Sequence, residues 1–349
     1  MRAREDAPQP ISTFRMMHRT MQPFNFRIVP KDADTPDVPE SVAMDVMRDV
    51  QMMLTDIGEL MIRRELRLQG RIPESIMSRF SLSKEAEDGK AVTEGDDTLM
   101  LDALNQLFDE LDQANMPEIH GKPSNYVEAY SRRNISRDIL ALCDHLNGYS
   151  LLYGSEGSLR KLRLNRRERL EAEASLDCSA FPGAVIGTVS GDPDRNGRWV
   201  ISYGPVAVPV TFDRNIDRSD IPLFARSGPV IAAGTVVSDD AMDITELRSV
   251  VGCYSFPSVK FHRIITAERD IILLVPAEAV PGYDPRKRMW SLKSELLGIS
   301  VSKPSWDECV LSFHDYFAFL WETYKESDGE LEGEELELRD LLASMELIQ

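Results

Sequence analysis

The chain has 349 residues, of which 42% are hydrophobic and 28% are charged, and its formal net charge is −18. This composition is typical of a soluble globular protein and excludes disorder of the whole chain, and the length suffices for two compact domains. The acidic excess disfavours nucleic acid and anionic membranes as partners, unless a local basic patch overcomes the long-range repulsion.

The first 36 residues carry five prolines and no sustained periodicity, which predicts a flexible arm with a short strand at "FNFRIV". Residues 37–176 are predicted to form a mainly helical domain with some strand. Its clearest element is a helix across 37–70, whose apolar residues recur at i, i+3, i+4 and i+7. Further helices are predicted at 99–114 and within 125–154, and "SRFSLS" alternates like a strand.

From about residue 177 to 280 the sequence is rich in Val, Ile, Gly and Pro with period-two alternation. Five short strands with tight turns predict a small β-barrel of the OB or SH3-like kind. The turn "DPDRNG" supports this interpretation, because Asp-Pro opens turns and Asn-Gly accepts positive φ. A further hairpin is expected from "FHRIITA" and "IILLVP". The fold class is therefore α+β.

Residues 281–349 are predicted to form an acidic helical C-terminal extension. Ser305 and Glu308 have the spacing of a capping box, which places a helix start at this point. An aromatic stripe then follows at helical spacing. Its packing against the rest of the chain is the favoured interpretation, and docking of a protein partner is the alternative. The candidate partner-binding residues are Phe313, Phe317, Trp321 and Tyr324.

One stretch contrasts with the acidic total, because residues 160–169 hold six positive charges and one negative charge. In the favoured interpretation these cations offset acidic neighbours on a solvated strand and helix. In the alternative they form a phosphate-binding patch together with "PRKRMW" at 285–290. The candidate nucleic-acid-binding residues are Arg160, Lys161, Arg163, Arg166, Arg167, Arg169, Arg286, Lys287 and Arg288.

Motifs for catalysis, metal binding and cofactor binding do not emerge from the sequence. It contains no GxxxxGK[ST], GxGxxG, HExxH or GxSxG pattern. The four cysteines form no CxxC pair, so reduced thiols are expected instead of disulfides or zinc. The five histidines show no ligand spacing, and the loop "SDDAMD" lacks the glycine and distal glutamate of a calcium loop. We therefore expect no cofactor and no metal.

These observations favour a non-enzymatic cytoplasmic protein that acts as a protein-interaction or regulatory module through amphipathic helices and a small barrel. The sequence shows no apolar run of membrane-spanning length and no secretory signal, so a membrane partner is not expected. A protein partner is predicted, and a homodimer is one form of it. Two alternatives stay open: a nucleic-acid-binding accessory protein that uses the basic clusters, and a hydrolase of unrecognised type.

Overall fold

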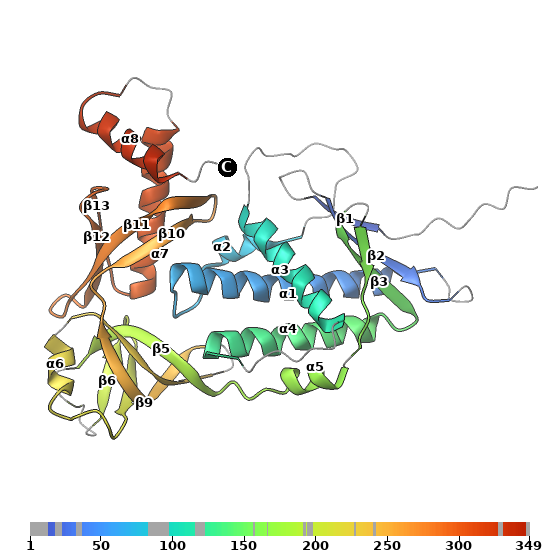
Figure 1. Ribbon diagram of the computed structural model, residues 1–349, viewed down its shortest axis with the longest axis horizontal. Helices are drawn as coiled ribbons and strands as arrows, with labels where there is room; N and C mark the ends of the chain where they lie inside the picture. The colour runs from blue at the N-terminus through green and yellow to red at the C-terminus, as the bar shows by residue number, and fades with distance from the viewer. Residues whose placement is uncertain are drawn as a thin grey trace, which may run out of the picture. The chain divides into compact units, whose positions relative to one another are not determined.

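The structure is a computed structural model that describes the chain except for several segments. The chain forms two compact units (Figure 1). Unit 1 draws on Met1–Gly58, Arg79–Lys122 and Ser131–Leu176, and unit 2 on Glu59–Ser78, Pro123–Tyr130 and Asp177–Gln349. None of the described helices is long and apolar enough to cross a membrane. The described residues are 13–17, 23–32, 37–82, 98–115, 123–155, 158–165, 167–190, 193, 198–226, 228–239, 242–326 and 331–346.

Unit 1 combines helices with a four-stranded antiparallel sheet of order β1-β2-β3-β4. The predicted strand at "FNFRIV" is confirmed as part of β2, and the three predicted helices are confirmed as α1, α3 and α4. The boundary between the units falls inside α1 and α4. The elements are β1 (Thr13–Met17), β2 (Pro23–Pro30), α1 (Glu40–Leu66), α3 (Thr98–Asn115), α4 (Tyr126–His145), β3 (Tyr149–Ser155), β4 (Ser158–Lys161) and α5 (Arg167–Ala174).

The predicted strand in "SRFSLS" is wrong. The segment instead begins with a single 3-10 turn, η1 (Ser78–Phe80), directly after the short helix α2 (Glu74–Met77). Phe80 is fully buried against α1, where a Cβ atom added at Gly58 would overlap its ring. Burial of the large Phe80 side chain therefore had more influence on the local backbone than the short alternating pattern of the sequence.

The predicted five-stranded barrel is confirmed in unit 2, and its strand order defines its type. The barrel closes in the order β5-β6-β7-β9-β8, with β7 and β9 parallel and every other pair antiparallel. Counted along the barrel this is 1-2-3-5-4, with a helix between the third and fourth strands, which is the topology of an OB fold. The elements are β5 (Ala180–Val189), β6 (Trp199–Ser202), β7 (Ala207–Phe212), α6 (Ile221–Arg226), β8 (Val230–Ser238) and β9 (Ile244–Ser255).

The predicted hairpin after the barrel is confirmed, but it belongs to a larger sheet. An antiparallel sheet of order β10-β11-β12-β13 follows the barrel, so the predicted C-terminal helices are present but begin only at Trp306 and not near residue 281. The strands "MWSLKS" and "ISVSK" are only six and five residues long, which leaves few positions for an alternating pattern. The elements are β10 (Val259–Ile265), β11 (Asp270–Asp284), β12 (Met289–Ser294), β13 (Ile299–Lys303), α7 (Trp306–Leu320), η2 (Trp321–Lys325) and α8 (Glu334–Met345).

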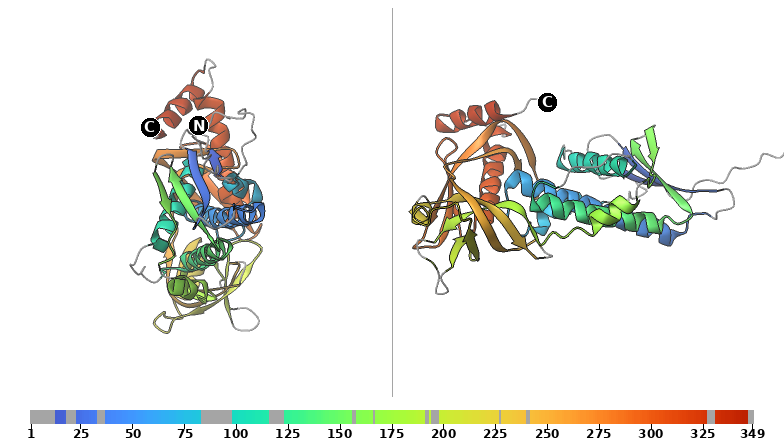
Figure 2. Two further views of the ribbon diagram at one scale, coloured as in Figure 1. Left: turned by 90° about the vertical axis from the view of Figure 1, so that its right-hand side faces the viewer. Right: turned by 60° about the horizontal axis from the view of Figure 1, so that its bottom comes forward.

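Helix α7 begins with the predicted capping box and packs along one face of this sheet. The Ser305 side chain accepts a hydrogen bond from the Glu308 backbone N–H, and the Glu308 carboxylate accepts one from the Ser305 N–H. Phe313 meets Phe261 of β10 at a ring distance of 5.3 Å, and Trp306 meets Trp290 of β12 at 5.6 Å. Figure 2 shows α8 at the far end of α7, beside η2.

Candidate functional site

The basic run at residues 160–169 is held by acidic side chains of neighbouring helices. The Arg160 guanidinium contacts the Asp112 carboxylate of α3 and lies over the Tyr153 ring, 5.3 Å from its centroid. Tyr153 donates a hydrogen bond of 2.6 Å to the same Asp112 carboxylate. Burial and this carboxylate together raise the pKa of Tyr153, which keeps its hydroxyl protonated.

Two further cations of the run, Arg167 and Arg169, lie on α5 and form ion pairs with carboxylates. Arg167 binds Asp144 at 2.7 Å and Glu171 at 2.8 Å, and Arg169 binds Glu173 at 3.1 Å. Lys161 and Arg163 are exposed, and Arg166 lies outside the described residues. Of the five described cations of the run, three therefore have carboxylate partners. This is the arrangement that the favoured, structural interpretation of the run predicts.

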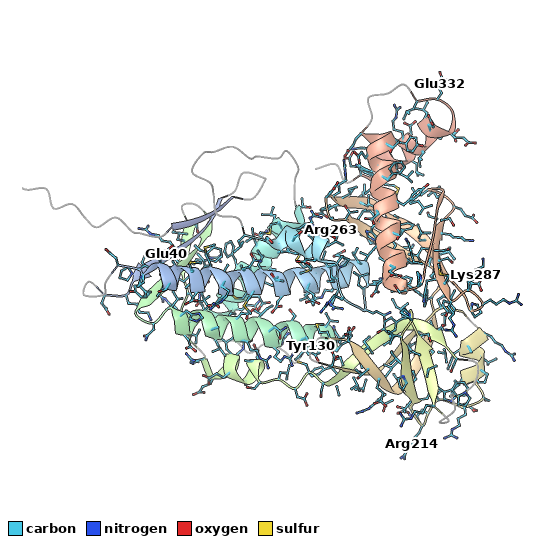
Figure 3. All side chains as sticks on the ribbon, turned by 180° about the vertical axis from the view of Figure 1, so that it is seen from behind. Glu40, Tyr130, Arg214, Arg263, Lys287 and Glu332 are labelled. Atoms are coloured by element: carbon cyan, nitrogen blue, oxygen red, sulfur yellow. The ribbon has the colours of Figure 1, made fainter. Side chains whose placement is uncertain are left out.

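The second basic cluster differs, because it forms the exposed turn between β11 and β12. Arg286, Lys287 and Arg288 are all exposed, and Arg288 has φ 53°. The Asp284 carboxylate accepts the backbone N–H groups of Arg286 at 2.9 Å and Lys287 at 3.2 Å. These hydrogen bonds hold the pKa of Asp284 below its usual range. We call residues 285–288 the basic turn; Figure 3 labels Lys287 there.

The aromatic residues predicted to bind a partner lie mostly inside the fold. Phe313 and Phe317 are fully buried, Trp321 is 3% exposed, and Tyr324 is half-buried. Phe317 also stacks on Trp321 at 5.9 Å. The internal-packing interpretation of this stripe therefore fits the structure, and Tyr324 alone among the four retains appreciable exposed surface.

A second pair of aromatic side chains on the same helix points to solvent. Tyr316 is 43% exposed and Phe319 is 56% exposed, and their rings meet edge to face at 6.1 Å. Three exposed acidic residues lie along the same side at seven-residue intervals: Glu308 and Asp315 of α7, and Glu322 of η2, which continues the helix. We call these five residues the α7 outer face. In Figure 3, α7 stands in front of the sheet.

In unit 1, polar side chains of α1 meet polar side chains of α4 in two pairs. His145 Nδ1 lies 2.6 Å from Asp49 Oδ2, and Asp56 forms a side-chain hydrogen bond with Asp138. Asp49 is 3% exposed and Asp138 is 7% exposed. Burial and the neighbouring Asp56 raise the pKa of Asp138 to about 7. Ionisation of both carboxyls would be costly, which favours the protonated form of the buried Asp138.

The structure also shows the surroundings of the cysteine and histidine residues that could act as nucleophiles or metal ligands. All four cysteines are free, and burial raises the pKa of Cys143 to about 12 and that of Cys309 to about 11. His314 is fully buried, accepts the Ile265 N–H at 3.0 Å, and has its pKa lowered to about 3 by burial. Within the described residues, no group of three or more potential ligands could hold a metal ion.

Comparison of the chain with protein-family models, curated proteins and solved structures found no match in any of the three. The functional argument therefore depends on the chain's own surfaces.

The sequence prediction missed Tyr316 and Phe319 because it assigned the aromatic residues of this helix to one stripe. The segment "FHDYFAFLW" holds five aromatic residues within nine positions, more than one helix face can accommodate. That crowding was the available signal. Asp56 and Asp138 gave no comparable signal, since carboxylates are common throughout the chain.

Proposed function

We propose that this protein is a non-enzymatic protein-interaction module that binds its partner on the α7 outer face. The supporting observation is the exposed Tyr316–Phe319 ring pair on a helix whose opposite side is fully packed. Single exposed apolar residues are ordinary, but adjacent exposed aromatic rings are typical of the anchors of protein interfaces.

The charges on this face define the chemistry of the partner. Glu308, Asp315 and Glu322 are exposed beside the two rings, although Arg269 lies 3.8 Å from Glu322 and partly balances it. A partner that covers the rings must also meet these carboxylates. An amphipathic segment with apolar and cationic side chains satisfies both requirements.

A direct binding measurement tests this proposal. The probe is a fluorescent amphipathic helical peptide built from Leu and Lys, and its control is the same peptide with Glu in place of Lys. We expect the cationic peptide to bind, and Phe319→Ser to weaken its binding about tenfold or more, because truncated aromatic anchors are the costly positions of interfaces. Fluorescence anisotropy measures both affinities.

Leu223→Ser is the matched control, because Leu223 of α6 is 53% exposed and lies outside the α7 outer face. It should leave peptide affinity unchanged. Equal binding of the cationic and acidic peptides, or equal loss in both variants, would contradict the proposal.

Nucleic-acid binding is the second candidate function, and the exposed basic turn favours it. The barrel adds little support. In OB folds the outward side of the second and third strands binds nucleic acid, and single strands stack on aromatic residues there. The register of β6 and β7 places Val200, Ser202, Ala207, Pro209 and Thr211 on that side, none of them aromatic.

The same assay separates the two functions when a fluorescent single-stranded oligonucleotide replaces the peptide. Binding that falls steeply with salt, disappears on reversing the charges of Arg286, Lys287 and Arg288, and survives Phe319→Ser would favour the nucleic-acid function. The hydrolase alternative gains no comparable support. Asp138, whose pKa is strongly raised, is only 7% exposed between two helices.

A further inference from the structure

The side of the C-terminal sheet that faces away from α7 forms a second exposed surface of unit 2. Residues directly opposite each other on neighbouring strands point to the same face. The register aligns Lys260 with Glu278, Val280 with Lys293 and Ser300, and Gly282 with Ser291 and Ser302. We call these eight residues the outer sheet face. The alternate residues of the strands face α7 and are mostly buried.

Two features distinguish the outer sheet face from the rest of this acidic chain. First, it carries Lys260 and Lys293, and the basic turn with three more cations extends it beyond the Gly282–Ser291 pair. Glu278 is the acidic member of the face and lies 3.8 Å from Lys260. Second, its centre carries Val280, which is 57% exposed and lies opposite Lys293, with Gly282 and Ser291 as the next pair along the strands. The surface is therefore cationic, with an exposed apolar residue beside small side chains.

These properties complement the α7 outer face, which presents two projecting aromatic rings beside three carboxylates. Aromatic rings can pack on an exposed valine and small side chains, and neighbouring Lys or Arg side chains would meet both the rings and the carboxylates. The two surfaces also point in opposite directions, because α7 covers the inner side of the sheet whose outer side carries the cations. One molecule therefore cannot bring its own two surfaces together.

We propose that a second copy of this chain is a partner of the α7 outer face, and that it binds through its outer sheet face and basic turn. This inference rests on the proposed function of the α7 outer face. A symmetric dimer through α7 is disfavoured, since it would place Glu308, Asp315 and Glu322 against themselves. The resulting contact is head-to-tail, so each added copy leaves one free surface of each kind. Successive copies then form open chains or close into rings.

Two variants that each block one surface test this arrangement. Phe319→Glu removes an exposed ring from α7 and adds a negative charge, and it leaves the outer sheet face intact. Lys293→Glu reverses the charge at the centre of the outer sheet face and leaves α7 intact. Arg226→Glu on α6 is the matched control, because it makes the same kind of charge reversal at an exposed site outside both surfaces.

We expect the wild-type chain to form a concentration-dependent series of oligomers at low salt in sedimentation velocity, and high salt to shorten the series. Each blocked variant alone should associate about tenfold or more weakly than the wild type, whereas Arg226→Glu should behave as the wild type does. A mixture of the two blocked variants should form a one-to-one dimer and nothing larger, because each molecule supplies one intact surface.

A wild-type chain that stays monomeric at every concentration would overturn the inference, and so would a mixture of the blocked variants that forms no dimer. These failures are distinct from failure of the proposed function. If the cationic peptide still binds in a manner sensitive to Phe319→Ser, the α7 outer face is a docking surface for another protein and not for a second copy.

Discussion

Replacing Asp270 by Ala should lower the free energy of unfolding of unit 2 by about 3–5 kcal/mol. Asp270 forms a bidentate ion pair with Arg263 across the β10–β11 hairpin, with both N···O distances at 2.6 Å. The Asp270 side chain is fully buried and that of Arg263 is 10% exposed. Removal of the carboxylate leaves a desolvated guanidinium without its main counter-charge, which is the costly way to break such a pair.

Tryptophan fluorescence measures this effect, because the four tryptophans of the chain, Trp199, Trp290, Trp306 and Trp321, all belong to unit 2. Denaturant unfolding followed at this signal reports the unit that contains the hairpin. The double variant Arg263→Met with Asp270→Leu should recover most of the loss, since an apolar pair of similar volume often replaces a buried ion pair without cost.

The same hairpin supplies the control. Lys260 and Glu278 also face each other across β10 and β11, but at 3.8 Å and with both side chains about half exposed. Glu278→Ala should cost no more than about 1 kcal/mol, because solvent screens such a pair. Equal losses from Asp270→Ala and Glu278→Ala would show that burial adds nothing to the Arg263–Asp270 pair, contrary to our expectation.

Unit 1 should lose stability as the pH rises from about 4 through 7, and Asp138→Asn should abolish most of that loss. The pKa of Asp138 is raised from 3.8 to about 7, mainly by burial and then by the charges of Asp56 and Asp49, against a small opposing effect of Arg137. The folded state therefore holds a proton that the unfolded chain releases. A raised pKa contributes stability that is complete below pH 3.8 and is lost as the pH passes the folded value.

A shift of about three pKa units corresponds to a loss of about 4 kcal/mol when complete, at about 1.4 kcal/mol for each unit. The Asp49–His145 pair also faces this helix contact, and burial raises the pKa of Asp49 in the same direction. Urea unfolding at several pH values, followed by helical circular dichroism and tryptophan fluorescence, should show a pH-dependent transition in the first signal alone. That transition reports unit 1, which contains no tryptophan.

Asp56→Asn should reduce the pH dependence only in part, because it removes the charge of Asp56 but leaves the larger effect of burial on the pKa of Asp138. Asp144→Asn is the matched control on α4. Its carboxylate is exposed and its pKa is lowered by the hydrogen bond from Arg167. It should leave the pH dependence between 5 and 8 unchanged. A wild-type stability that rises across this range would contradict the raised pKa of Asp138.

Local sequence patterns predicted the elements whose signals lie within a few residues. The apolar periodicity of α1 corresponds to a buried stripe that includes Val46, Val50, Met53 and Ile57. The Ser305–Glu308 capping box starts α7 at the predicted place. The five barrel strands lie where period-two alternation predicts them, and β7 buries every second side chain at Val208 and Val210.

The candidate surfaces depended on contacts that no local pattern encodes. Packing against the sheet determines which aromatic residues of α7 are buried: Phe313 and Phe317 are covered, and Phe319 stays in solvent. Likewise, Arg160 and Arg167 of the basic run pair with Asp112 and Asp144, which lie 48 and 23 residues earlier in the chain. Prediction of these pairs from sequence would have required the packing of the helices in advance.

By itself, therefore, the sequence determined the α+β class, the helix faces of unit 1, the barrel strands and the start of α7. Only the tertiary structure decided that β7 and β9 run parallel and give the barrel its OB order, that residues 281–303 continue as a sheet, and that Asp56 meets Asp138. The physical reason is one of range. Propensity, capping and periodicity act between residues a few positions apart, whereas barrel closure, charge pairing and the choice of a buried face depend on segments that meet only in the folded chain.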